Sequence, residues 1–294
     1  VSSGIFSIVL NKNILKPLNE LTRATKEIAS GNFNIKVDNV LNPFNKSSEL
    51  GTLVDGFNNM AGELKSTEMF RNDFIHNFSH EFKTPIISIR GFARQLYQGN
   101  LTPEQEREFA RIIMDESEQL ANMSSNVLLL TKLENQEIVT DKTHFYLDEQ
   151  LRNCLILFEE QWTEKGLNLD LELERISVYQ NAEILSHVWK NLISNAIKFS
   201  KPNGHLRVNC QKAIDHIHII VEDTGYGMTE ETMSQIFDKF YQGDTSHATQ
   251  GNGLGLALVK RIIDITGSDI SVESELGKGT TFTVKMRRAA NGTI

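Results

Sequence analysis

The hydrophobic period of the sequence changes near Glu137, and this change limits the folds that the chain can adopt. Before Glu137, apolar residues recur every three or four positions, which is the spacing of an amphipathic α-helix. After it, short apolar runs are separated by turn-forming residues, a pattern typical of strands. We therefore expect helices before this point and a mixed α/β domain after it.

Residues 11–65 are predicted to form two helices joined by an extended connector. The first helix carries Pro17 near its start and ends at Gly31, and the second begins at Glu49-Leu-Gly51. Each helix has only a narrow apolar stripe, which one chain cannot bury, so the pattern predicts a parallel bundle made by two copies. The stripe of the second helix consists of Leu53, Phe57, Met60 and Leu64.

The next helical region is predicted to be a hairpin. A long helix over residues 66–97 ends at Gly99, and a second helix starts at Thr102, with Gln105 at the capping-box position, and runs to about Glu134. A single hairpin would leave its apolar seam exposed. Two hairpins are therefore expected to form a four-helix bundle.

The C-terminal region is predicted to be an α/β sandwich in which one layer of helices covers a mixed sheet. The expected strands are 145–147, 167–173, 205–212, 216–222, 269–274 and 280–286. The expected helices are 148–165, 181–199 and 254–266.

Several side chains that can take part in catalysis lie close together in residues 74–85, Phe-Ile-His-Asn-Phe-Ser-His-Glu-Phe-Lys-Thr-Pro. His80 and Thr84 are four positions apart, so they share a helix face, and Glu81 lies beside them. A neutral imidazole is a good nucleophile near pH 7. A lone histidine is usually packed or solvated, and this is the better interpretation of His76. Whether His80 acts as a nucleophile therefore depends on a nucleotide site elsewhere in the chain.

Candidate nucleotide-binding segments lie between residues 187 and 281. On the helix before Phe199, Asn191, Asn195 and Lys198 form one polar stripe, whose oxygens and ammonium suit a magnesium-bound triphosphate. Three Gly-rich turns follow, and glycines at a helix start present backbone N–H groups to phosphate. These turns are Asp223-Thr-Gly225-Tyr-Gly227, Gly251-Asn-Gly253-Leu254-Gly255 and Gly277-Lys-Gly279-Thr280.

Each segment alone is weak evidence for a nucleotide site. Together, in this order and downstream of His-Glu-x-x-Thr-Pro, they make the sequence strongly resemble the sensor histidine kinases of two-component systems. The ATP-binding domain of that family is shared with gyrase, Hsp90 and MutL. The similarity covers nearly the whole chain, and Pro17, Gly31 and Glu49-x-Gly51 resemble a HAMP signal-relay module. The resemblance implies a parallel HAMP helical bundle, a dimeric four-helix bundle made of helical hairpins, and an α/β sandwich of the gyrase, Hsp90 and histidine-kinase type.

The resemblance also implies a function. The expected protein is a homodimeric, ATP-dependent kinase that phosphorylates His80, passes the phosphoryl group to an aspartate of a response regulator receiver domain, and also dephosphorylates that partner. His80, Glu81 and Thr84 are its expected catalytic residues, and Asn195 its expected Mg2+ ligand. The expected ATP-binding residues are Asn191, Asn195, Lys198, Asp223, Gly225, Gly227, Phe240, Gly251, Gly253, Leu254, Gly255 and Thr280.

The net charge and the N-terminal residues indicate whether the protein binds nucleic acid and where in the cell it lies. The net charge of −8 and the absence of a strongly basic block argue against nucleic acid as a partner. The apolar residues Ile5 to Leu10, followed by lysines, indicate the end of a truncated transmembrane helix, so we expect the cytoplasmic portion of a cell-membrane protein. The expected domains are 1–10 transmembrane end, 11–65 HAMP, 66–137 dimerisation and histidine phosphotransfer, 141–288 catalytic ATP binding, and 289–294 tail.

One departure from the family pattern bears on catalysis. An arginine commonly follows the Phe-Tyr pair in the family, whereas this chain has Gln242. Loss of that cation leaves two alternatives to an active kinase. One is a degenerate, phosphatase-biased kinase, and the other is a non-catalytic, ATP-gated scaffold. The intact His80 segment argues against the scaffold.

Overall fold

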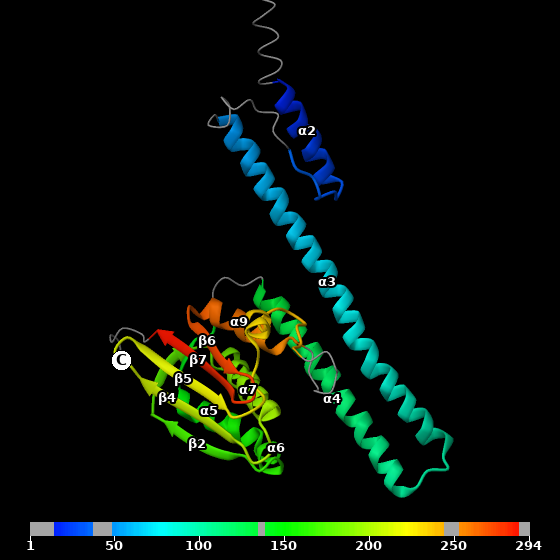
Figure 1. The fold of residues 1–294 in the computed structure, drawn as a ribbon, viewed down its shortest axis with the longest axis vertical. Helices are drawn as coiled ribbons and strands as arrows, with labels where there is room; N and C mark the ends of the chain where they lie inside the picture. Colours follow the sequence, from blue (N-terminus) through cyan, green and yellow to red (C-terminus); the bar gives the residue numbers. More distant parts are fainter. Residues whose placement is uncertain (1–14, 38–48, 135–138, 244–252, 288–294) are drawn as a thin grey trace, which may run out of the picture. The chain divides into compact units, whose positions relative to one another are not determined.

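The fold was obtained as a computed structural model that describes residues 15–37, 49–134, 139–243 and 253–287 (Figure 1). The expected transmembrane end, Gly251 and the expected tail lie outside these residues. The chain divides into two compact units, residues 1–79 and 80–294. Across the described ranges, no helix combines the length and the apolar character that crossing a membrane requires.

The first unit contains α2 (Lys16–Ala29) and the first part of α3 (Glu49–Gln98). Pro17 lies in the first turn of α2, where its missing N–H costs nothing. The extended residues 32–37 join the core through Val37, whose N–H donates to Asn58 Oδ1 at 2.9 Å and whose carbonyl accepts from Asn58 Nδ2 at 3.1 Å. The buried core of this unit consists of Leu21, Ala24, Val37, Val54, Phe57 and Ala61.

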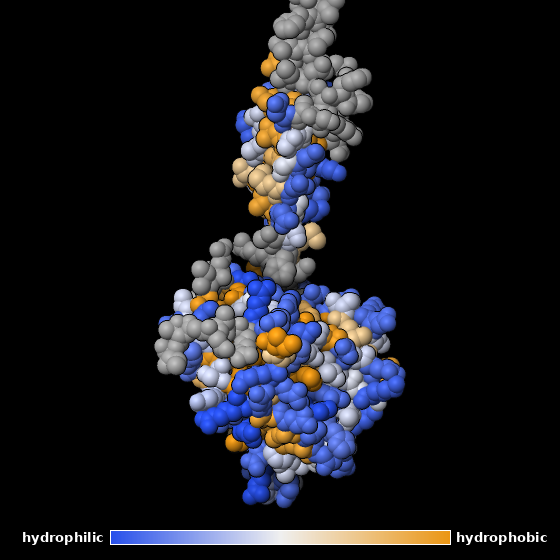
Figure 2. All heavy atoms as spheres, turned by 90° about the vertical axis from the view of Figure 1, so that its left-hand side faces the viewer, coloured by the Kyte–Doolittle hydropathy of each residue, from blue (hydrophilic) through white to orange (hydrophobic). Residues whose placement is uncertain are grey.

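One copy of this unit leaves part of the predicted stripe uncovered. Phe57 is buried, whereas Leu53 and Met60 remain 55% and 47% exposed, as does Leu18 of α2 at 47%. Figure 2 shows, on one face of this unit, apolar side chains among hydrophilic ones. The narrow stripe is therefore only partly buried within one chain.

The second unit begins with a helical hairpin, as predicted. Gly99 and Asn100 end α3 with positive φ angles of 72° and 65°, and α4 (Pro103–Glu134) follows. The capping box is formed, because Thr102 N donates to Gln105 Oε1 at 3.0 Å and Gln105 N donates to Thr102 Oγ1 at 3.3 Å. The rings of Phe92 and Phe109 pack across the two helices with centroids 5.0 Å apart.

The α/β domain contains a five-stranded sheet in the order β2-β4-β5-β7-β6, with the helices on one side of it (Figure 1). In the described part of this sheet, β2 and β4 are parallel and the other neighbouring strands are antiparallel. Separately, β1 and β3 form an antiparallel pair. The strands are β1 (Thr143–Tyr146), β2 (Asn168–Leu173), β3 (Ser177–Gln180), β4 (His205–Lys212), β5 (His216–Asp223), β6 (Asp269–Glu275) and β7 (Gly279–Arg287). The helices are α5 (Leu147–Leu157), α6 (Glu159–Glu164), α7 (Ala182–Phe199), α8 (Glu230–Gln235) and α9 (Gly255–Thr266).

Local signals explain where the main helices of this domain begin and end. The Asn181 side chain caps α7 by accepting from Ile184 N at 3.0 Å. Gly267, with φ of 66°, ends α9 in the left-handed conformation that glycine adopts without strain. The expected helix 148–165 is instead two helices, because the backbone of Phe158 departs from helical geometry with φ −105° and ψ 17°. Strand β3 and helix α8 were not predicted.

Candidate active site

The predicted phosphoacceptor lies on α3 with its side chain exposed. Thr84 is also exposed, one turn further along, and its Oγ1 donates to the His80 carbonyl at 3.4 Å. Within the described residues, the His80 imidazole has no hydrogen-bond or ion-pair partner. A solvent-facing imidazole is therefore accessible to a second reactant.

Glu81 points along a different direction from His80, as neighbouring helical residues must. Its Oε2 accepts a 3.4 Å hydrogen bond from Gln242 Nε2. Its backbone carbonyl loses its helical partner, because residue 85 is a proline inside α3 and has no N–H to donate. The structure thus links Glu81 to the position that departs from the family pattern.

The polar stripe on α7 is partly exposed, as expected for residues that meet a ligand. Asn191 Nδ2 donates to the carbonyl of His187 at 2.7 Å, which fixes the carboxamide orientation. Its oxygen lies against the backbone of Gly255, where an added Cβ would overlap Asn191 Oδ1. Two predicted segments, separated by more than sixty residues, are therefore in contact.

Lys198 stands at the end of the same stripe. Its Nζ lies 4.6 Å from the centroid of the Phe199 ring, and burial lowers the pKa of its ammonium. The Asn195 carboxamide has no hydrogen-bond partner within the described residues. The Asn195 carboxamide oxygen, a possible metal ligand, and the Lys198 ammonium therefore lie one turn apart on α7.

Asp223 ends β5 and is buried, with 5% of its surface exposed. Gly225 N donates to Asp223 Oδ1 at 2.8 Å. Burial raises the pKa of this carboxyl to about 6, although backbone N–H groups of Gly225 and Thr280 oppose the shift. At neutral pH the carboxylate is ionised and can accept a hydrogen bond from a ligand.

The glycines around Asp223 are required by close approaches of the backbone. A Cβ at Gly225 would overlap the Phe199 carbonyl, one at Gly227 the Glu275 carbonyl, and one at Gly279 the Asp223 carbonyl. Thr280 pairs with Asp223 across the β5–β7 ladder. These contacts bring the end of α7, the turn after β5 and the start of β7 to one place.

A hydrogen bond joins two residues that stand on either side of the segment 244–252 in the sequence. Phe240 N donates to the Gly253 carbonyl at 2.9 Å. Both residues have left-handed backbones, with φ of 62° and 64°, and this conformation is strained for phenylalanine. Leu254 is fully buried directly after this link, whereas Gly251 lies outside the described residues.

Comparison with known proteins places these features in a family. Residues 9–66 match the HAMP domain, 70–136 the His Kinase A (phospho-acceptor) domain, and 180–290 the histidine kinase-, DNA gyrase B- and HSP90-like ATPase family. The heme sensor protein HssS of Staphylococcus saprophyticus is 33% identical over 290 residues, which are 97% of this chain and 61% of that protein. This chain belongs to the sensor histidine kinases of two-component systems.

Solved structures agree with this assignment. The Acinetobacter baumannii histidine kinase AdeS superposes with a TM-score of 0.59 at 25% identity, covering 71% of this chain and 97% of that one. Full-length ShkA in complex with AMPPNP superposes with a TM-score of 0.55 at 26% identity, covering 75% and 47%. This sensor histidine kinase spans less than two thirds of HssS. Its predicted fold class is confirmed, and its third domain belongs to an ATP-binding family.

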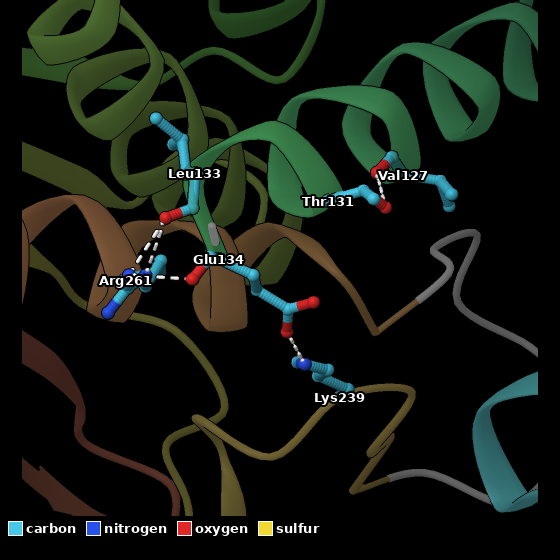
Figure 3. A network of polar contacts seen from close by, with 6 residues as sticks. All are labelled: Val127, Thr131, Leu133, Glu134, Lys239 and Arg261. Carbon is cyan, nitrogen blue, oxygen red and sulfur yellow. Dashed lines mark hydrogen bonds and ion pairs between the residues drawn. The ribbon is translucent and has the colours of Figure 1, made fainter. Parts of the chain in front are cut away.

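Sequence reasoning missed a polar network between the end of α4 and the ATPase domain of this histidine kinase (Figure 3). Arg261 of α9 donates to the Leu133 carbonyl from Nε at 3.0 Å and from Nη2 at 2.8 Å. Lys239, two residues after Phe237, forms an ion pair with Glu134. Such contacts join residues more than one hundred positions apart, so no local spacing could have revealed them.

Two lysines, Lys239 and Lys260, are candidates to supply the missing cation of this histidine kinase, and each forms an ion pair. Lys239 pairs with Glu134, and Lys260 pairs with Asp264 at 2.9 Å on the outer side of α9. The guanidinium of an arginine at position 242 would add a cation that can stabilise charge developing on the transferred group.

We expect Gln242→Arg to raise the rate of histidine phosphorylation by about threefold to tenfold, with ATP affinity changed by less than about twofold, if the cation acts in the transition state. Single-turnover labelling at saturating ATP measures the rate, and calorimetry measures the affinity. Gln242→Met is the matched control, because it removes the bond to Glu81 without adding charge. An equal rate in Gln242→Arg and wild type would show that the cation is not limiting.

Proposed function

We propose that this chain is an ATP-dependent protein-histidine kinase that phosphorylates His80. The observation that carries the proposal is the convergence of α7, the turn after Asp223 and the start of α9 around close backbone contacts, in a chain that also exposes His80. A nucleotide site and an accessible nucleophile are the two parts that such a kinase needs.

The nucleotide would be selected at Asp223 and held along α7. An ionised, buried carboxylate accepts a hydrogen bond from an exocyclic amino group, such as that of adenine. Lys198 would neutralise phosphate charge, and Asn191 would orient a ligand or water. The backbone N–H groups at the start of α9, next to Gly253 and Gly255, would face phosphate oxygens.

Mg2+ fits the same site, because the Asn195 side chain offers a hard oxygen donor without a protein partner among the described residues. The bound ion would neutralise charge on the phosphate oxygens of ATP. Asn195 would hold it together with those oxygens.

In the proposed reaction, a ring nitrogen of His80 attacks the γ-phosphorus, an N–P bond forms, and the bond from phosphorus to the ADP oxygen breaks. Glu81, which accepts from Gln242 in this structure, would turn toward the ring to fix the imidazole tautomer or take its proton. The phosphoryl group would then pass to an aspartate of a response regulator receiver domain.

The surrounding organisation is part of the proposal. A homodimer is supported by the exposed Leu53 and Met60 of α3 and by the apolar seam of α4, where Phe109, Ile113, Leu120 and Val127 are only half-buried. We propose that a transmembrane segment precedes residue 11 and that the chain is the cytoplasmic portion of a membrane sensor. The domain limits proposed are 11–65, 66–137 and 141–288, with 1–10 and 289–294 as the flanking segments.

Incubation of the full chain with γ-labelled ATP and Mg2+ tests the kinase activity. We expect acid-labile, alkali-stable label on the protein, which is the behaviour of phosphohistidine, and its transfer to a receiver domain. Binding of ATP without label would instead favour the non-catalytic scaffold. Weak labelling with strong removal of phosphate from a phospho-receiver would favour the phosphatase-biased kinase.

Thr84 provides a separate test of phosphatase activity. Its hydroxyl shares the helix face of His80. Among the residues that the structure describes, its partner is the His80 carbonyl, through a long bond of 3.4 Å, so it can orient a water toward a partner's phospho-aspartate. We expect Thr84→Ala to keep His80 phosphorylation within about twofold and to lose at least about tenfold of the dephosphorylation rate, since forward transfer uses His80 itself.

Decay of a purified phospho-receiver with wild type and with Thr84→Ala measures this difference. Ser79→Ala is the control, because Ser79 is exposed on the preceding turn and likewise donates to a helix carbonyl, that of Ile75 at 2.7 Å. Equal decay rates for wild type and Thr84→Ala would leave Thr84 with a structural role.

A further inference from the structure

Lys165 occupies a position that no sequence motif identifies. It follows α6 and precedes the left-handed Gly166, and its side chain is half-buried. Its Nζ donates to the Ile197 carbonyl at 2.8 Å and to the Lys198 carbonyl at 2.6 Å. These carbonyls are in the last turn of α7, where backbone oxygens lack helical partners and a cation is favoured by the helix dipole.

The end of α7 is in turn bonded to the turn that follows Asp223. Tyr226 N donates to the Phe199 carbonyl at 3.1 Å, and Ser200 pairs with Gly225 in an isolated β-bridge. The Lys165 ammonium therefore fixes a backbone segment that carries Lys198 on one side and contacts the Asp223 turn on the other.

The positive charge of Lys165 also lowers the pKa of Asp223. The other charged group with a marked effect is Glu222 on the same strand, which raises the Asp223 pKa, whereas Lys165 lowers it. The neighbouring strands place uncharged residues opposite Asp223, namely Leu206 on β4 and Thr280 on β7. Asp223 reciprocally opposes the lowering of the Lys165 pKa that burial causes.

We propose that Lys165 is a positioning residue of the nucleotide site, which holds the end of α7 against the turn that follows Asp223, the residue proposed to receive adenine. This inference rests on the proposed function, because it assigns Asp223 to the nucleotide. Lys165 does not contact the nucleotide itself. It acts through the two α7 carbonyls and through its charge.

Loss of the ammonium should weaken ATP binding in a pH-dependent way. The Asp223 carboxyl has a raised pKa of about 6, so in wild type the acceptor form is lost as pH falls through about 6. Without Lys165 the pKa rises further and the loss begins at higher pH. A merely structural effect would lower affinity by the same factor at every pH.

The experiment measures ATP affinity of the full chain by calorimetry between pH 5.5 and 8 for wild type, Lys165→Met and Lys165→Arg. We expect the ratio of wild-type to Lys165→Met affinity to grow by about two- to threefold from pH 8 to pH 5.5, because the Asp223 carboxyl of the variant becomes protonated at a higher pH than that of wild type. Lys165→Arg should follow the wild-type profile, because it keeps the charge and the donors. Protonation of ATP itself is common to all variants and cancels in the ratio.

Each outcome distinguishes the two proposals. A wild-type chain that binds no ATP at any pH would overturn the proposed function. Wild-type binding with a constant ratio between pH 5.5 and 8 would overturn the role of Lys165 alone. If Lys165→Met does not fold, Lys165→Gln takes its place, because its amide can still donate to an α7 carbonyl without carrying charge, and the same growth of the ratio is expected.

Discussion

His80→Gln is expected to abolish phosphorylation of the chain, with labelling reduced at least about a thousandfold, while ATP affinity stays within about threefold. Glutamine keeps the length and hydrogen-bonding capacity of the side chain but has no nucleophilic ring nitrogen. The nucleotide residues lie on α7, β5 and α9, whereas His80 lies on α3, so the substitution leaves the nucleotide site intact. Incorporation of γ-labelled phosphate and calorimetric ATP binding measure the two quantities.

His76→Gln is the matched control. His76 is also exposed and lies one turn before His80 on the same helix. It precedes no Glu-x-x-Thr string, so we expect this variant to be labelled at the wild-type rate within about twofold. Persistent label on His80→Gln, or loss of label on His76→Gln, would reassign the acceptor.

The sequence predicted helix boundaries well where a local signal sets them. Gly99 and Asn100 end α3 and the Thr102–Gln105 capping box starts α4, as expected, since each depends on a few adjacent residues. The break at Phe158 was missed, because the flanking residues carry a continuous helical pattern and no glycine or proline marks the interruption. There the Leu155 carbonyl accepts from the Phe158 N–H at 3.1 Å and from Trp162 Nε1 at 3.0 Å.

In the candidate site too, the sequence identified residues that belong to local motifs but not the contacts between segments far apart in the chain. Asn191 and Gly255 were identified from their motifs, but the contact between them, which explains why residue 255 lacks a side chain, is visible only in the fold. Lys165 was missed for a similar reason. A lysine before a glycine is a common surface feature, and its two bonds reach carbonyls more than thirty residues away.

Gly253→Ala is expected to reduce ATP affinity at least about tenfold and His80 phosphorylation about a hundredfold. The backbone at Gly253 has φ of 64°, and an added Cβ would lie 2.5 Å from the carbonyl carbon of Phe240 and 2.8 Å from the carbonyl oxygen of Tyr241. Real Cβ atoms do not approach backbone this closely, so the link between Phe240 and Gly253 must open. This displaces the start of α9, whose N-terminus is the proposed phosphate site.

Gly267→Ala is the control that separates the effect of the Cβ clash at Gly253 from the effect of backbone strain. Gly267 ends α9 with nearly the same angle, φ of 66°, but a Cβ there would meet nothing within 4 Å. In both variants the left-handed conformation of alanine lowers the free energy of unfolding by about 1 kcal/mol, so both should melt a few degrees below wild type. Only Gly253→Ala should lose nucleotide affinity, as measured by calorimetry beside thermal unfolding. Equal affinities in the two variants would mean that the Phe240–Gly253 link does not shape the nucleotide site.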